Sequence, residues 1–466
     1  MKHKHAYLFV FNLLLAMLLV ACGGGEESVE EVEEAPIEEE VAEAGRTKAP
    51  VEEADDSGSK IITIASINDS TNIDPRSNYD LGLATIAQQY ETLTYFNPPG
   101  SAEAISPLLA ESWEANEDRT EWTFTLKQGV KFHDGTDFNA DAVKAVVEGV
   151  RDGYYATSWI FRPVVDIEII DDYTIKFTNE NPAPLDLIFS SGFGAWMVSL
   201  EGMAQDSEWF QAGNNAGTGP YKITNREPGT RIVMERHEEY WRGWNDNKFE
   251  TVVFEFIPDP TVREQMIRSG NIDLTAGLNP DNIPSLQEAE GVDVKIDSSY
   301  ENRFIYINQA KEGPLQNKKV RQALALSYPY EEVLANINGG FGTPAGGMIS
   351  SSMWGADESL RLTQDLEAAK ALLAEAGYPD GGVSLEYWAF EDDPLYEQMA
   401  ELWISPLRDL GIELTIRVID FNTAIELAQN DPENAHDLMG SLWSPTYVTP
   451  FDPMFSGFAT GEYFTN

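Results

Sequence analysis

Cysteine and histidine are scarce in this sequence, which has one cysteine (Cys22) and five histidines among 466 residues. A single thiol permits no intrachain disulfide, and the chain beyond Cys22 has no cysteine for a zinc site or a catalytic thiol. Two of the histidines, His3 and His5, lie in the basic start of the chain. A secreted hydrolase needs a nucleophile–base pair or a metal cluster, and this chain offers few cysteine and histidine side chains to form either. We therefore expect no enzyme activity and no cofactor.

The sequence motifs of nucleotide-binding and hydrolytic enzymes are also missing. Gly217-Thr218-Gly219 resembles a phosphate loop only superficially, because Pro220 follows it and the Gly-Lys-Ser/Thr ending is absent. His237-Glu238 has no second histidine at the spacing of a zinc protease, and no Gly-x-Ser-x-Gly elbow occurs. His133-Asp134 lies in a predicted hairpin turn, and we interpret it as turn structure.

Basic residues are few: 31 lysines and arginines face 78 aspartates and glutamates, for a formal net charge of −47. Such an excess of negative charge repels phosphate backbones and anionic lipid headgroups, so nucleic acid is excluded as a partner. A saline habitat and a cationic ligand would both favour this charge, and composition does not choose between them.

The one long apolar run lies at the start of the chain, from Ala6 to Ala21, with Asn12 as its only break. This run is shorter than the ~20 residues of a bilayer-spanning helix and follows a short basic segment, as in an export signal. Cys22 directly follows Leu19-Val20-Ala21, as in a bacterial lipobox. We therefore predict a lipoprotein signal peptide over 1–21, with Cys22 acylated and serving as the membrane anchor.

The next segment, residues 22–59, is predicted to be an acidic disordered tether. From Glu26 to Ser59 it is mostly Glu, Ala, Val, Ser and Gly, and it contains no aromatic residue. Such a composition cannot bury enough apolar surface to offset the entropy of ordering the chain, and like charges extend it.

From Lys60 onward, strand and helix patterns alternate without a repeat, which predicts an α/β chain of two or more lobes. Strands are predicted at 60–65, 121–126, 251–256 and 302–308, and two short strands within 166–177. Helical spacing extends over 83–93 and 261–269. The clearest helix is 365–377, with Asp365 as its cap and Gly377 at its end.

Several blocks together resemble the extracytoplasmic solute-binding proteins of peptide and nickel ABC importers, also called family 5. They occur in the family's order over nearly all of 60–466: Leu108–Trp113, Leu126–Val143, Gly217–Tyr221 with Glu239–Trp241, Lys319–Leu324 and Asp365–Tyr378.

The resemblance implies a two-lobed periplasmic-binding-protein-like fold that encloses its ligand between the lobes. We expect lobe I at 60–95 and 210–305, an inserted subdomain at 96–209, and lobe II at 306–466. Members of the family normally continue past this point and return to lobe I. We therefore expect that a carboxy-terminal segment is missing and that lobe II is truncated.

The ligand is the least determined part of this interpretation. Dipeptide binders of the family hold the peptide's amino group with an Asp shortly after a Trp, whereas here Thr446 takes that place after Trp443. They hold the carboxylate with an Arg in an earlier loop, and the comparable loop here is Glu391-Asp392-Asp393-Pro394. An acidic loop repels a carboxylate, which disfavours a plain dipeptide.

Candidate ligand-binding residues are polar or aromatic, because aromatic rings provide large contact area with few rotors. For each aromatic residue, core packing is the competing interpretation. The candidates are Asn72, Trp388, Phe390, Glu391, Trp443, Thr446 and Tyr447; we predict no metal ligand and no catalytic residue.

The sequence thus predicts a monomeric, extracytoplasmic lipoprotein that captures a peptide-like solute and delivers it to the permease and ATPase subunits of an ABC importer. Alternatives that the sequence leaves open are a surface peptide-sensing receptor of the same fold and a binder of an oligosaccharide or a nickel complex. A secreted hydrolase is the least favoured.

Overall fold

A computed structural model describes residues 60–69, 72–78, 83–153, 155, 157–245, 248–391, 393–451 and 454. These residues belong to one compact unit, Gly58–Asn466. The predicted signal peptide, Cys22 and the tether lie outside the described residues.

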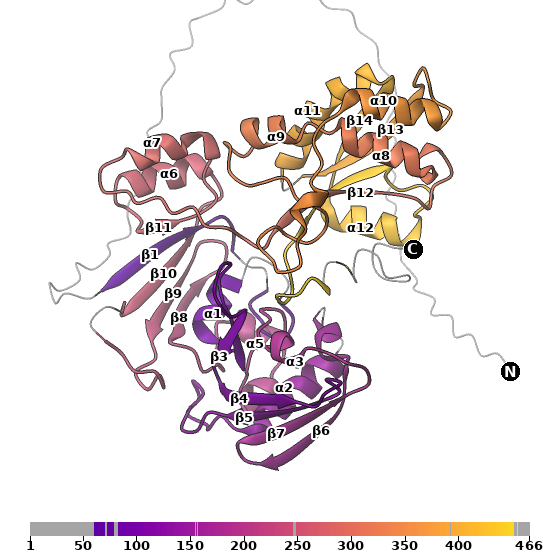
Figure 1. Cartoon of the computed structure of the whole chain (residues 1–466). Helices are drawn as coiled ribbons and strands as arrows, with labels where there is room; N and C mark the ends of the chain where they lie inside the picture. Colours follow the sequence, from indigo (N-terminus) through magenta and orange to yellow (C-terminus); the bar gives the residue numbers. More distant parts are fainter. Residues whose placement is uncertain are drawn as a thin grey trace, which may run out of the picture. The chain divides into compact units, whose positions relative to one another are not determined.

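The first sheet, called here the amino-terminal sheet, has five strands in the order β11-β1-β10-β9-β8. Its strands are β1 (Ile61–Ser66), β8 (Tyr221–Glu227), β9 (Arg231–Arg236), β10 (Thr251–Phe256) and β11 (Leu274–Thr275). The indigo β1 runs parallel to the pink β10, with Ile61 opposite Thr251, so segments far apart in sequence lie side by side (Figure 1). Val252 and Phe254 of β10 are buried and their neighbours are more exposed, which confirms the half-buried strand predicted at 251–256.

The second, middle sheet is antiparallel, in the order β4-β5-β7-β6. It consists of β4 (Ala110–Ala115), β5 (Glu121–Leu126), β6 (Val164–Asp171) and β7 (Thr174–Asn179). The two short strands predicted within 166–177 are confirmed as β6 and β7.

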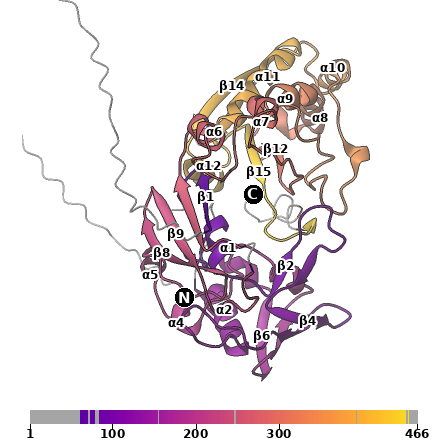
Figure 2. The same ribbon diagram turned by 90° about the vertical axis from the view of Figure 1, so that its left-hand side faces the viewer.

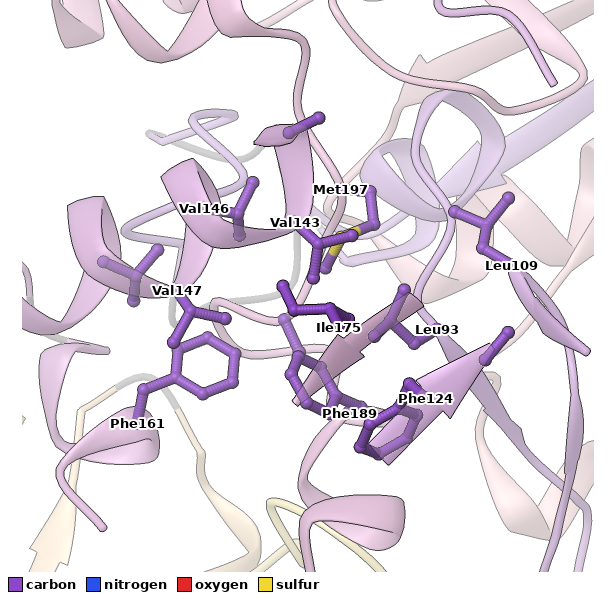
Figure 3. Close-up of a cluster of buried hydrophobic side chains, with 14 of the residues drawn as sticks. Leu93, Leu109, Phe124, Val143, Val146, Val147, Phe161, Ile175, Phe189 and Met197 are labelled. Carbon is purple, nitrogen blue, oxygen red and sulfur yellow. The ribbon is translucent and has the colours of Figure 1, made fainter. Parts of the chain in front are cut away.

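Helix α2 (Ala140–Asp152) packs on the middle sheet through one apolar face. The Asn139 side chain accepts a hydrogen bond from the Ala142 amide at 3.1 Å, which caps the helix at its start. Val143, Val146 and Val147 recur at helical spacing and are fully buried. Figure 3 shows these valines in one cluster with Phe124 and Ile175 of the sheet and with Phe189, which follows the helical turn Leu185–Ile188. This cluster is the largest apolar core of the described residues.

The third, carboxy-terminal sheet has the order β12-β15-β13-β14. Its strands are β12 (Asn302–Ile307), β13 (Val383–Phe390), β14 (Ile412–Ile419) and β15 (Leu438–Trp443). β13 is parallel to both neighbours, and β12 is antiparallel to β15. Tyr387, Trp388 and Ala389 in β13 are all fully buried, because helices cover the sheet as they do in α/β proteins.

The helices of the carboxy-terminal part are η3 (Pro314–Gln316), α8 (Lys318–Ser327), α9 (Tyr330–Asn336), η4 (Glu358–Leu360), α10 (Leu366–Glu375), α11 (Leu395–Asp409) and α12 (Phe421–Asn430). The predicted cap of α10 is confirmed, since Asp365 accepts from the Ala368 amide at 2.9 Å. Gly377 follows with a φ of 97°, the left-handed conformation that favours glycine at a helix end.

A fourth, two-stranded antiparallel sheet consists of β2 (Thr94–Phe96) and β3 (Ile105–Pro107). The other short elements are α1 (Leu83–Gln89), η1 (Ser158–Phe161), α3 (Leu185–Ile188), α4 (Leu200–Met203), α5 (Ser207–Gln211), α6 (Pro260–Arg268), η2 (Pro280–Asn282) and α7 (Ile283–Gln287). None of the helices that the structure describes is both long enough and apolar enough to cross a membrane.

The helix predicted over 83–93 is wrong beyond Gln89, where α1 ends. The Gln89 carbonyl accepts a hydrogen bond from the Gly219 amide at 2.9 Å instead of continuing the helix. Gly217 lies so close that a Cβ atom there would be 2.0 Å from the Gln89 carbonyl oxygen. The loop after Gly217 therefore terminates α1 through a contact with no local sequence signal.

Candidate functional site

The candidate site is a cavity of about 2060 Å³ beside the carboxy-terminal sheet. Residues 301–310, which include all of β12, form one wall. Other walls come from α8 and α9, from the segment 341–352, and from residues of α11 and β15. β15 lies beside β12 in Figure 2. Ligand pockets for drug-sized molecules are about 300–1,000 Å³, so this cavity has room for a larger solute.

Aromatic side chains line the cavity floor. Tyr328 packs edge-on against Trp403, with ring centroids 5.2 Å apart, and against Tyr330 at 5.0 Å. The Trp403 indole donates to the Ser327 hydroxyl at 2.8 Å. Burial raises the pKa of Tyr330 to about 12 and that of Tyr328 further, so both phenols stay neutral donors. The Tyr328 hydroxyl has no hydrogen-bond partner among the described residues.

Arg303 projects from β12 at the cavity wall. One of its guanidinium nitrogens, Nη1, donates to Asp393 Oδ2 at 2.8 Å, and the group stacks over the Tyr396 ring at 5.0 Å. Asp393 also accepts from the Leu395 amide at 3.1 Å, at the start of α11. Arg303 of β12 therefore neutralises part of the negative charge of the acidic loop at 391–394.

His436 lines the cavity as a buried neutral imidazole. Its ring lies 5.2 Å from the Trp388 ring, and burial lowers the pKa of His436 to about 4. Nδ1 of His436 has no hydrogen-bond partner within the described part of the chain.

The sequence-predicted aromatic residues of β13 lie in the core. Trp388 is 0% exposed; its indole donates to Glu386 at 2.5 Å, and the Arg417 guanidinium lies over its ring. Phe390 is buried edge-on against Tyr396 at 5.6 Å. Neither is among the described residues that line the cavity.

The candidates that follow β13 in the sequence lie in three places. Glu391 is exposed, and Asp392 beside it lies outside the described residues. Trp443 is half-buried at the end of β15, opposite Asn302 of the cavity wall, and is not itself among the described residues that line the cavity. Thr446 and Tyr447 are buried, and Tyr447 packs in the apolar cluster of the middle sheet rather than with Trp388 and Phe390.

Asn72 belongs to a loop held by its own hydrogen bonds. Its side-chain oxygen accepts from the Asp74 amide and from the Gln211 side chain, both at 3.0 Å. Asp74 and Arg76 in the same loop form a buried ion pair at 2.7 Å. These contacts give Asn72 a structural role whether or not it also touches a ligand.

The two parts of one block that carries the family resemblance, Gly217–Tyr221 and Glu239–Trp241, meet at a buried carboxylate, Glu91. It accepts from the Thr218 hydroxyl at 2.9 Å, the Tyr240 hydroxyl at 2.8 Å and the Trp241 indole at 2.7 Å. Burial raises the pKa of Glu91, and the three donors oppose that rise. The segments at 217–221 and 239–241 thus contact each other through Glu91, which explains these residue types without a ligand.

His133 is buried beside His237, with ring centroids 5.2 Å apart. Its Nε2 lies 2.9 Å from the Gly219 carbonyl, so Nε2 carries the proton and donates. Burial lowers the pKa of His133 to about 3 from its ordinary 6.5. Together with the Asp134–Thr136 hydrogen bond in the same turn, this supports turn structure rather than catalysis.

Acidification is expected to destabilise the protein through His133. Between pH 6.5 and about 3 the unfolded chain binds a proton on this residue that the folded chain does not, so stability falls as pH falls. From pH 7 to pH 5 this contribution is about 2 kcal/mol. Urea unfolding of wild type and His133→Gln at both pH values isolates it, because glutamine keeps a donor but does not titrate. A stability difference between the two proteins that is independent of pH would contradict the expectation.

Among the residues that the structure describes, no group of three or more His, Cys, Asp or Glu side chains could hold a metal ion. The site missed by sequence reasoning is the β12 wall with Arg303. The one feature of the sequence that pointed to this wall was Arg303, a basic residue in the strand predicted at 302–308 of an acid-rich chain.

Comparisons with known proteins identify the same family that the sequence blocks resemble. A family model described as bacterial extracellular solute-binding proteins, family 5 Middle, matches residues 104–464. The probable D,D-dipeptide-binding periplasmic protein DdpA of Escherichia coli (strain K12) is 27% identical over 399 residues, covering 84% of this chain and 76% of that protein. The dipeptide-binding protein of the same strain is 27% identical over 370 residues, covering 73% and 68% of the two chains.

A solved structure shares the fold: the dipeptide-binding protein from Pseudoalteromonas sp. SM9913 in complex with Met-Leu. It matches with a TM-score of 0.70 and 25% sequence identity, over 85% of this chain and 82% of that chain.

Proposed function

This chain belongs to the bacterial extracellular solute-binding proteins of family 5, and from that premise we propose that it captures a peptide for delivery to the permease of an ABC importer. The family resemblance and the two-lobed α/β fold expected from the sequence are confirmed. The observation that carries the proposal is the cavity of about 2060 Å³, which has room for several residues of peptide. Dipeptide-binding relatives support a peptide as the solute.

Capture and delivery need no covalent chemistry. Lobes that close over a polar ligand exclude water, and a permease can then recognise the closed form. The permease and ATPase subunits are accordingly the proposed protein partners, with the binding protein acting as a monomer.

The lipid anchor is part of the same proposal. Acylation of Cys22 by more than one chain would hold the protein stably at the outer side of the membrane, since a single chain binds only marginally. Mass spectrometry of the mature protein is expected to show an acylated amino-terminal Cys22. An unmodified amino terminus at another residue would contradict the anchor without touching the proposed peptide capture.

Native mass spectrometry followed by denaturing release tests the solute class directly. A tight ligand dissociates slowly and therefore survives purification. Present at ~1,000 times its dissociation constant, it also adds about 4 kcal/mol of stability. We expect a released peptide, or, from an empty protein, a thermal shift with a peptide pool. Release of a sugar or metal complex, or shifts only with such solutes, would overturn the peptide assignment.

Trp443 is the sequence-predicted aromatic residue that we retain as a proposed ligand contact. It is half-buried at the end of β15, opposite Asn302 of the cavity wall, and its indole N–H has no partner among the described residues. Trp443→Ala is expected to weaken peptide binding about 10-fold or more, because it removes a large aromatic contact, while the protein still unfolds cooperatively. Isothermal titration measures this, and unchanged affinity would remove Trp443 from the site.

A further inference from the structure

A segment with the sequence pattern of a strand, residues 291–297, lies between α7 and β12 (Figure 1). β-branched and charged residues alternate in it with the period of two that is typical of a half-buried strand. The β-branched positions are Val292, Val294 and Ile296, and the charged positions are Asp293, Lys295 and Asp297. These residues nevertheless belong to none of the four sheets that the structure describes. We call residues 291–297 the connector segment.

The backbone of the connector segment is largely unpaired. The Val292 amide donates to the Ala289 carbonyl at 3.3 Å, and no backbone hydrogen bond joins residues 293–297 to the rest of the described chain. Val292 and Val294 are half-buried, whereas the other five residues of the segment are exposed. Ile296 is 49% exposed. A strand-like segment with free N–H and C=O groups is a template for pairing with another chain.

The charged side chains of the connector segment are unpaired as well. Within the described part of the chain, no ion pair and no hydrogen bond engages the side chains of Asp293, Lys295 or Asp297. Basic residues number 31 against 78 acidic ones in the sequence, so a lysine between two aspartates is a distinctive feature of this segment. The segment therefore presents both signs of charge to a partner.

The connector segment is complementary to a second copy of itself that runs antiparallel. With Val294 at the centre, opposite Val294 of the second copy, Asp293 lies opposite Lys295. The same arrangement places Val292 opposite Ile296. Each of these two contacts occurs twice, because a twofold axis makes the interface isologous. Opposite charges and β-branched residues that lie directly across a strand pair are stabilising contacts.

Charge also selects the register of this pairing. A shift that centres the ribbon on Asp293 or on Lys295 places two like charges directly opposite each other, which is destabilising. A parallel pairing in register does the same at every charged position. The antiparallel register centred on Ile296 keeps opposite charges together but places Ser298 opposite Val294, so it has fewer apolar pairs. The register centred on Val294 therefore combines the most favourable contacts.

The size of the connector segment limits the strength of such a contact. Seven residues per copy are fewer than the about 20–30 residues a side of a standard interface, and a two-stranded ribbon alone is marginally stable. The formal charge of −47 on each copy also repels the other copy. We therefore expect a weak, reversible dimer with a Kd of about 10–100 μM. Salt at about 0.5 M should favour it, since salt screens long-range repulsion more than direct contacts.

We propose that two copies of this protein pair reversibly through the connector segment, as an antiparallel ribbon centred on Val294. This inference goes beyond the proposed function and is independent of the solute. Lys295 and Asp297 also line the cavity, so the dimer covers part of the cavity wall. Capture and delivery are accordingly left to the monomer, which is in equilibrium with the dimer.

Reversal of charge at the ribbon tests the pairing, by sedimentation equilibrium of the full chain carrying Cys22→Ser, which cannot be acylated or cross-linked at that residue. Asp293→Lys places lysines opposite each other, and Lys295→Asp places aspartates opposite each other. Each should weaken the dimer about 10-fold or more. An equimolar mixture of these two proteins should restore dimers, because every lysine of one copy then lies opposite an aspartate of the other.

Asp297→Lys is the matched control for Asp293→Lys. It makes the same change in net charge, but Asp297 lies opposite Gly291 in the proposed register and should leave the dimer no weaker than wild type. A wild type that stays monomeric at about 0.5 mM, well above the expected Kd, overturns the proposal. So does a dimer that Asp293→Lys does not weaken, or a mixture of the two charge variants that stays monomeric.

Oxidation of single-cysteine variants tests the register directly, because the chain with Cys22→Ser has no other cysteine. Val294→Cys should form an intermolecular disulfide, since residues directly opposite in an antiparallel pair have Cα atoms about 4.5–5.5 Å apart, within disulfide reach. Ser298→Cys is the control: the two copies of residue 298 would lie roughly 27 Å apart, eight residues at 3.4 Å each. Equal cross-linking of both variants, or none of Val294→Cys, overturns the ribbon centred on Val294.

Discussion

Replacement of Asp74 by leucine is expected to lower the free energy of unfolding by about 3–5 kcal/mol, since it leaves the Arg76 charge buried without its partner. Asp74 is 0% exposed and Arg76 2%. Arg76 Nε and Nη2 donate to the two carboxylate oxygens at 2.9 and 2.7 Å, and the guanidinium lies 4.5 Å from the Phe210 ring centroid. Urea denaturation monitored by fluorescence measures the loss.

The double variant Asp74→Leu/Arg76→Met is the control for this prediction. It removes both charges and keeps apolar volume, so it is expected to recover much of the stability lost in Asp74→Leu. Asp74 Oδ2 also accepts from the Ser207 hydroxyl at 2.7 Å, so recovery will be incomplete. If Asp74→Leu unfolds like wild type, the ion pair does not anchor this loop.

Trp388→Ala is expected to destabilise the protein by about 3–5 kcal/mol, the cost of removing a fully buried large aromatic side chain. Trp388 is 0% exposed, and its ring packs against the Arg417 guanidinium at 5.3 Å and the His436 ring at 5.2 Å. The prediction separates core packing from ligand contact for a residue that the sequence placed in the binding site.

Trp388→Phe is the matched control, because it keeps a ring in the core and loses only the indole bond to Glu386. We expect a loss of about 1–2 kcal/mol for that variant and peptide affinity close to wild type. A Trp388→Ala protein of normal stability that no longer binds peptide would show that the indole contacts ligand, contrary to its buried position.

The contrast between Trp388 and Trp443 shows where prediction from sequence stops. Both are tryptophans that the sequence offered as ligand-binding candidates, and aromatic residues serve cores and pockets equally well. The structure places Trp388 in the central strand of its sheet, covered on both faces, and Trp443 at the end of β15 beside the cavity wall. Strand order decides this difference, and strand order depends on contacts between distant segments.

The sequence by itself determined the features that depend on neighbouring residues and on ordered blocks. The caps of Asn139 and Asp365, the left-handed glycine at Gly377 and the alternation in 251–256 follow from local chemistry and periodicity. The five blocks in the family's order identified the class of protein.

Only the tertiary structure decided which distant groups meet. Glu91 contacts Thr218 and Trp241 across 127 and 150 residues, and Arg303 meets Asp393 across 90. The same holds for the end of α1 at Gln89, which a backbone bond from Gly219 sets, and for the place of β12 at the end of its sheet. The physical reason is that a buried charge or strand edge is stabilised by whatever partner folding brings to it, and that partner leaves no trace in the local pattern of residues.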